Sequence, residues 1–166
     1  MPDDLYHHDI LAWSRTQADR LRRLRQGERP NDLDWDHIIE EVEDLGAGQL
    51  NGGKAHLGLA LLHALKCLAC PESSHVGHWQ QEIAAFLDNA QNNFQPGMQQ
   101  HIDPAALYAK ALKQVRKLPP VGGVAPRPLP EMVVFSAAEL RDEDFGTTDL
   151  LVRLRAASAT GPTGDA

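Results

Sequence analysis

The stretch LDWDHIIEEVEDLG, residues 33–46, decides the fold class of this chain, because it combines a helix start, an apolar stripe, a polar face and a stop. Asp34 can accept hydrogen bonds from the unpaired amides of a first helical turn. Gly46 supplies a residue that tolerates the positive φ found after many helix ends. The apolar residues between them recur at steps of three and four, which gathers them on one helical face. We therefore expect a helix that ends at Gly46 and whose apolar face belongs to the core, formed by Trp35, Ile38, Ile39, Val42 and Leu45.

Length and composition predict one helical domain. A chain of 166 residues is long enough to bury a core of its own. Hydrophobic residues make up 42% of the chain but aromatic residues only 5%, so the core must consist mainly of aliphatic side chains, which suits helices better than sheets. We expect a single domain over residues 1–145 and a tail over residues 146–166, with a marginal helix followed by a disordered end.

Charge, hydropathy and cysteine content limit the classes of function. A formal net charge of −7 argues against a general nucleic-acid binder. We find no run of eighteen apolar residues and no signal-peptide pattern, so no membrane contact is expected. The two cysteines, Cys67 and Cys70, suit a reducing compartment better than a disulfide scaffold. We therefore expect a cytoplasmic protein.

The same periodicity predicts about five main helices in an all-α, up-and-down bundle. The glycine-rich residues 47–56 fit either a loop or a weak helical start. A Pro/Gly-rich segment at residues 119–131 should be irregular, with extended pieces packed over the bundle. Ser136 and Glu139 have the spacing of a capping box, which predicts a short C-terminal helix. The main helices are expected at residues 4–26, 33–46, 54–70, 76–94 and 103–119, and the marginal last one at 150–157.

Landmarks in a fixed order run along most of the chain. They are Tyr6, Asp9, Ala12, Trp13, Gln17 and Ala18, then the stretch at 33–46, HALK at 63–66, Pro71, Trp79, LYAKA at 107–111, Ser136, Leu140 and DEDF at 142–145. This ordered set resembles the bacterial and cyanobacterial proteins called domain-of-unknown-function family twenty-nine. The resemblance implies an all-helical, up-and-down fold with no established activity and supplies no catalytic residues. The family usually has an aromatic residue where this chain has Cys67, so any role of Cys67 would be particular to this protein.

Carboxylates and histidines on two neighbouring predicted helices form the first candidate site. Such side chains are the ligands that helical bundles use for divalent metals, although the Glu-x-x-His pair of di-iron bundles does not occur here. One hypothesis is therefore a metal-binding or hydrolytic bundle centred on Glu40, Glu43 and His63. The alternative is a partly buried polar network that fixes helix register. The candidate residues for either are Asp9, Asp36, Glu40, Glu43, His63 and Lys66.

A second group of possible metal ligands begins at His63. His63, Cys67 and Cys70 share one helical face, and His75 and His78 follow after Pro71. A leucine-rich helix is an unusual place for a structural zinc site, and a cysteine there is more often a small core residue. We therefore predict no cofactor, with a divalent metal on these five residues as the minor alternative.

Opposite charges are separated along the first 45 residues. The segment from Arg15 to Arg29 has six arginines and two acids, a net charge of 6 − 2 = +4, whereas residues 31–45 have seven acids and no Lys or Arg, a net charge of −7. A basic helix beside an acidic one explains this pattern. The weaker alternative is that the arginines contact nucleic acid.

These observations favour a non-enzymatic helical module that binds an unidentified protein partner or self-associates. We find no phosphate-binding glycine loop after a strand, no GxSxG elbow and no HExxH. The sequence leaves the ligand and the oligomeric state open.

Overall fold

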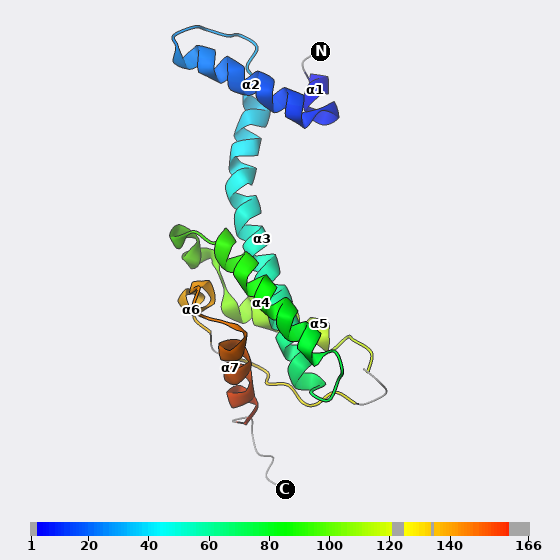
Figure 1. Ribbon diagram of the computed structural model, residues 1–166. Coiled ribbons are helices and arrows are strands. Elements are labelled where there is room, and N and C mark those ends of the chain that lie inside the picture. Colours follow the sequence, from blue (N-terminus) through cyan, green and yellow to red (C-terminus); the bar gives the residue numbers. More distant parts are fainter. Residues whose placement is uncertain (1–2, 121–124, 134, 160–166) are drawn as a thin grey trace. The chain divides into compact units, whose positions relative to one another are not determined.

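A computed structural model describes residues 3–120, 125–133 and 135–159, whose regular secondary structure is helical with no strand (Figure 1). Five of the helices are at least 12 residues long, which confirms the predicted all-α fold with about five main helices. The elements are α1 (Asp3–His8), α2 (Ile10–Arg25), α3 (Trp35–Ala69), α4 (Val76–Asn93), the 3-10 helix η1 (Pro96–His101), α5 (Pro104–Val115), α6 (Ala137–Arg141) and α7 (Thr147–Ala159).

The chain divides into two compact units, and the boundary between them falls inside helix α3. Unit 1 is Met1–Gly48 and unit 2 is Gln49–Ala166. The single folding domain expected over residues 1–145 stays a prediction.

Unit 1 begins with two helices where the sequence predicted one over residues 4–26. The helix is interrupted at Asp9, whose backbone φ of −150° and ψ of 82° are not helical. The Asp9 side chain accepts a hydrogen bond from the Ala12 amide at 2.9 Å and so caps α2. Gly27, with φ of 92°, follows the end of α2 and allows the chain to turn.

Asp34 connects α2 to the start of α3. One of its carboxylate oxygens accepts a hydrogen bond from Trp13 Nε1 at 2.9 Å and lies 2.8 Å from His37 Nδ1. The Asp34 amide donates to Gln17 Oε1 at 3.1 Å. Partial burial of Asp34 raises its pKa, but the hydrogen bonds from Trp13 and His37 outweigh that effect and hold the pKa below its usual value. The predicted helix start at Asp34 is therefore confirmed.

Tyr6 packs on the same cluster from α1. Its ring stacks on the His37 ring at a centroid distance of 3.9 Å, and its hydroxyl donates to Glu41 Oε1 at 2.7 Å. The hydrogen bond to Glu41 raises the pKa of Tyr6 to about 12, so the phenol keeps its proton. Polar and aromatic contacts thus hold the helices of unit 1 together.

The predicted helix end at Gly46 is wrong. Helix α3 runs without interruption from Trp35 to Ala69, through Gly46, Gly48, Gly52 and Gly53. Among the described glycines, only Gly27 has a positive φ, so the glycines of α3 keep helical geometry. Each costs about 1 kcal/mol relative to alanine in a helix, a penalty that tertiary packing can offset.

The prediction that the apolar face of residues 35–45 belongs to the core is also wrong. Trp35 is 50% exposed, Val42 68% and Leu45 76%. Only Ile38 on this face is partly buried. The periodicity identified the face correctly, but it carries no information about the neighbours that would cover that face.

Unit 2 contains the apolar core. Residues 49–69 of α3 contribute several of its fully buried side chains, and α4, α6 and α7 contribute others. Gly53 lies against Phe94, because a Cβ atom there would come within 2.5 Å of the Phe94 ring. Helix α4 packs on α6 and α7, and α6 packs on η1. The fully buried core side chains include Leu57, Leu61, Leu65, Ile83, Tyr108, Leu140, Leu150 and Leu154.

Two helix starts in unit 2 agree with the sequence: the helix expected from residue 103 and the capping box expected at Ser136. Asp103 accepts from the Ala106 amide at 3.0 Å and caps α5. Ser136 and Glu139 form both hydrogen bonds of a capping box at α6. Helix α7 is longer than the marginal helix expected at residues 150–157, and its leucines enter the core. Of the end predicted to be disordered, residues 158–159 belong to α7 and residues 160–166 lie outside the described part.

Candidate functional site

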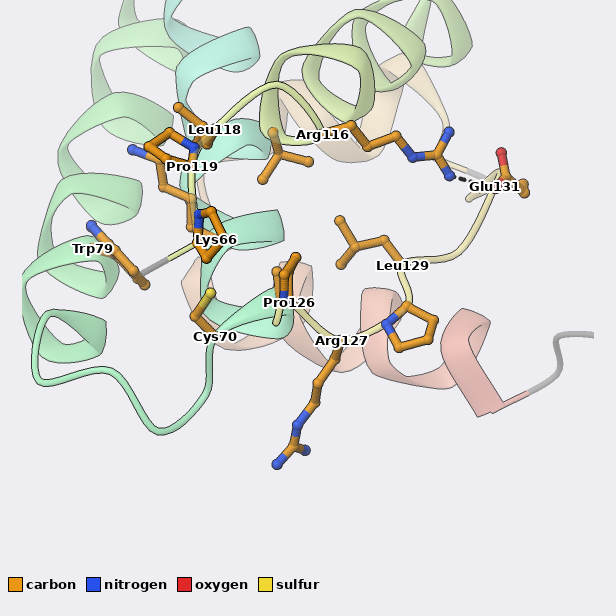
Figure 2. Close-up of a pocket in the computed structure, with 14 residues that line it drawn as sticks. Lys66, Cys70, Trp79, Arg116, Leu118, Pro119, Pro126, Arg127, Leu129 and Glu131 are labelled. Atoms are coloured by element: carbon orange, nitrogen blue, oxygen red, sulfur yellow. Dashed lines mark hydrogen bonds and ion pairs between the residues drawn. The ribbon is translucent and has the colours of Figure 1, made fainter. Parts of the chain in front are cut away.

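A pocket of about 430 Å³ lies in unit 2, between the last turn of α3, the start of α4, the end of α5 and the irregular segment that follows α5. Its walls are mostly apolar and include four prolines, which have no backbone N–H to offer a ligand. Figure 2 shows Trp79 at one side of this pocket, Leu129 facing its interior and Lys66 between Trp79 and the proline segment. Clefts of this size and character are typical of small-molecule sites.

Two hydrogen bonds hold the irregular segment against the helices. The Arg127 amide donates to the carbonyl of Ala69, the last residue of α3, at 2.8 Å. The Tyr108 hydroxyl donates to the Pro130 carbonyl at 2.6 Å. Burial raises the pKa of Tyr108 to about 12, so the hydroxyl remains a donor. The irregular segment packed over the helices is confirmed for residues 119–120 and 125–131, and it forms one wall of the pocket, whereas residues 121–124 lie outside the described part.

Four charged side chains are among the lining residues: Lys66, Arg116, Arg127 and Glu131. Arg116 forms an ion pair with Glu131, and Arg127 forms one with Glu72. The Lys66 ammonium lies 5.8 Å from the centre of the Trp79 ring, within the range of a cation–π interaction. Among the lining cations, Lys66 is therefore the one that has no ion pair within the described part of the chain.

His63, a residue of both predicted sites, belongs to a separate polar cluster between α3 and α4. Its Nδ1 atom lies 2.8 Å from Glu82 Oε2, and His78 Nε2 lies 3.4 Å from the other oxygen of Glu82. Burial lowers the pKa of His63, and the positive charge of Lys66 acts in the same direction. This arrangement makes Glu82 the carboxylate partner of His63 within unit 2.

The other predicted network residues are divided between the units. Asp36, Glu40 and Glu43 are exposed on α3 in unit 1. Lys66 is on α3 in unit 2, where it lines the pocket. The sequence predicted that these acids and His63 lie on two separate helices. That prediction is wrong, because the acids and His63 all belong to the single helix α3. The pairing of His63 and Lys66 with the acidic residues stays a prediction.

The five residues of the alternative metal site have different surroundings. Cys67 is buried, and burial raises the pKa of its thiol to about 11. Cys70 lines the pocket, and the His75 ring stacks on Trp79. Within the described part of the chain, no three His, Cys, Asp or Glu side chains are placed to hold a metal ion.

Some arginines of the basic segment pair with acids of unit 1. Arg20 lies 2.5 Å from Asp32, and Arg23 lies 2.7 Å from Glu28. The first of these pairs joins the basic segment to the acidic one. Such pairing supports a structural role for the charge separation.

Sequence reasoning named Lys66 and Cys70 but missed the rest of this pocket. Trp79 is a family landmark in the sequence and belongs to the buried core as well as to the pocket lining, whereas no sequence pattern singles out Arg116, Leu129 or Glu131. The available signal was the Pro/Gly-rich segment, since an irregular stretch packed over a bundle leaves space that helices would fill.

Comparison with known proteins first places this chain in the class of all-helical proteins. The structure matches the crystal structure of an alpha-helical protein of unknown function from Rhodospirillum rubrum, with a TM-score of 0.63 and 26% sequence identity over 90% of this chain and 96% of that one. The chain belongs to the family described as Domain of unknown function DUF29, which matches residues 5–146. The predicted family is thereby confirmed, and the description of that family assigns no function. No curated protein matches the chain. None of the described helices is long and apolar enough to cross a membrane.

Proposed function

We propose that this chain is a helical binding module that takes an apolar ligand, or the apolar part of one, into the pocket of unit 2. The observation that carries the proposal is a cavity of about 430 Å³ whose irregular wall is fixed by hydrogen bonds from Arg127 and Tyr108. A wall that is ordered before binding lowers the entropic cost of taking up a ligand. The prolines in that wall reduce this cost further.

The groups that line the pocket favour binding over acid–base catalysis. Glu131 is the carboxylate among the lining residues, and it is paired with Arg116. The His63–Glu82 pair, which has the chemistry of a general base, is not part of the lining. This supports the binding module over the hydrolytic bundle that was the alternative from sequence.

Titration with 1-aminoanthracene, a neutral apolar dye whose fluorescence rises in apolar surroundings, tests the proposal. We expect saturable binding to the unaltered protein. Leu118→Trp adds a large side chain to the pocket wall at a position that is 44% exposed and should weaken binding about tenfold, equivalent to about 1.4 kcal/mol.

Leu59→Trp is the matched control, because Leu59 is 39% exposed in the same unit and does not line the pocket. It should leave the affinity unchanged. Absence of saturable binding to the unaltered protein, or equal weakening by both variants, would overturn the proposed function.

A further inference from the structure

The charges on the pocket lining are unbalanced. Lys66, Arg116 and Arg127 line the pocket, but two of these cations are neutralised: Arg116 by the lining carboxylate Glu131, and Arg127 by Glu72, which does not line the pocket. In a pocket with apolar walls, charges are screened less than on an open surface. The positive charge of the pocket therefore rests on Lys66.

Lys66 differs from the two arginines. Arg116 has Glu131 as its partner and Arg127 has Glu72, and Figure 2 shows the Arg127 guanidinium extending away from the other lining side chains. Among the described residues, no carboxylate pairs with Lys66, whose ammonium lies over the Trp79 ring. A cation–π contact leaves the donors of an ammonium group available for an anion.

A structural role for Lys66 has to be separated from a role in binding. Lys66 lies in the last turn of α3, where a cation interacts favourably with the helix dipole. That role requires only a positive charge near the helix end and does not depend on what occupies the pocket. The two roles are therefore distinguished by whether replacing Lys66 changes the preference of the protein for charged over neutral ligands.

We infer that the ligand of this pocket is an amphipathic anion, with an apolar body held between Trp79, Leu129 and the prolines and a carboxylate or similar head group bound by the Lys66 ammonium. This inference rests on the proposed binding function and specifies the class of ligand. Burial of an apolar body supplies most of the affinity, and the charge-assisted hydrogen bond to Lys66 supplies selectivity.

Three probes with the same alkyl chain test the class of ligand. Decanoate, 1-decanol and decyltrimethylammonium carry a negative, a neutral and a positive head, and their affinities can be measured by isothermal titration calorimetry below the concentrations at which they aggregate. We expect decanoate to bind about tenfold more tightly than decanol, and the cation to bind most weakly.

Cys70 reports whether binding occurs in this pocket. It lines the cavity and is a free thiol, so bound decanoate should slow its reaction with N-ethylmaleimide. Cys67 is buried and its thiol has a raised pKa, so it serves as the unreactive reference within the same peptide. Fragment-ion mass spectrometry separates the two positions.

Lys66→Met removes the charge but keeps an apolar side chain. It should lower the affinity for decanoate about tenfold, leave the affinity for decanol unchanged and abolish the preference between them. Lys110→Met, on α5 and outside the lining, is the control and should change neither affinity.

The outcomes separate the two proposals. Equal affinities for decanoate and decanol, or an unchanged preference in Lys66→Met, overturn the inference about the anion and leave the binding module standing. If none of the probes binds and Cys70 is not protected, the inference fails, and absence of 1-aminoanthracene binding as well overturns the proposed function.

Discussion

The two parts of helix α3 have the same kind of sequence pattern and opposite surroundings. In unit 1, residues 35–48 expose their apolar face, and Leu45 is 76% exposed. In unit 2, residues 49–69 bury theirs, and Leu65 is 0% exposed. Amphipathic periodicity therefore specifies a helix and its apolar face, whereas burial depends on residues far away in the sequence.

The units also differ in what stabilises them. In unit 1, a hydrogen-bonded cluster around Asp34 joins α2 to α3, together with the stacked rings of Tyr6 and His37. In unit 2, a continuous apolar core brings together side chains from α3, α4, α5, α6 and α7. Directional polar contacts therefore dominate one unit and apolar packing the other.

The largest effect should come from truncating the same residue type in the two parts of α3. Leu65→Ala removes a fully buried side chain and should lower the free energy of unfolding by about 2–5 kcal/mol. Leu45→Ala makes the same chemical change at an exposed position and should change it by less than about 0.5 kcal/mol. Urea unfolding followed by circular dichroism measures both. Similar losses for the two variants would mean that the face at Leu45 is covered.

The next largest effect should come from Asp34. Asp34→Ala removes the acceptor for Trp13 and His37 at the start of α3 and should destabilise unit 1 by about 1–3 kcal/mol. Asp36→Ala is the control, because Asp36 is exposed and contributes mainly through the helix dipole, worth about 0.3–1 kcal/mol. Hydrogen exchange over residues 10–45 measures the loss locally. If both variants exchange alike, Asp34 does not hold the two helices together.

Two glycines of α3 should respond to alanine with opposite signs. At Gly46 an added Cβ meets nothing within 4 Å, so Gly46→Ala should stabilise the continuous helix by up to about 1 kcal/mol. At Gly53 the added Cβ would clash with the Phe94 ring, and the strain, about 1–3 kcal/mol, should cancel or exceed that gain. Thermal unfolding of both variants tests this. A lower Tm for Gly46→Ala would show that the helix ends there with a positive φ.

The smallest effect should be the pH dependence due to Glu139 in the capping box of α6. Hydrogen bonds from Ser136 and Arg153 lower the pKa of Glu139 to about 2, below its ordinary value of 4.5. Because the folded state favours the ionised form, this contribution to stability is complete above pH 4.5 and is lost as the pH falls toward 2. Solvent screening keeps it small. The Tm of Glu139→Gln should therefore fall less than that of the unaltered protein between pH 6 and pH 3, and identical profiles would contradict this assignment.

The accuracy of the sequence-based predictions followed the range of the interactions involved. The helix start at Asp34 and the capping box at Ser136 were predicted correctly, since such signals involve residues one to three positions apart. The helix break at Asp9 was missed although its cap on Ala12 is equally local, because the apolar periodicity continues across it. The continuity of α3 at Gly46 was missed because a glycine after an apolar stripe fits either a helix end or a helix interior, and the φ that decides between them is not written in the sequence.

The pocket could be predicted only in part. The irregular wall followed from its prolines and glycines, but its position followed from the bonds of Tyr108 to Pro130 and of Arg127 to Ala69, which join distant parts of the chain. In the same way, Glu82 could not be recognised as the partner of His63 from a helix pattern alone.

By itself, the sequence determined the all-helical class, most helix starts, the family and the irregular segment after α5, because short-range hydrogen bonding and side-chain periodicity fix these features. Only the tertiary structure decided which apolar faces are buried, at which residues the apolar face of α3 changes from exposed to buried, and which side chains surround the pocket. The physical reason is that burial and cavity shape depend on contacts between residues distant in sequence, which periodicity does not encode.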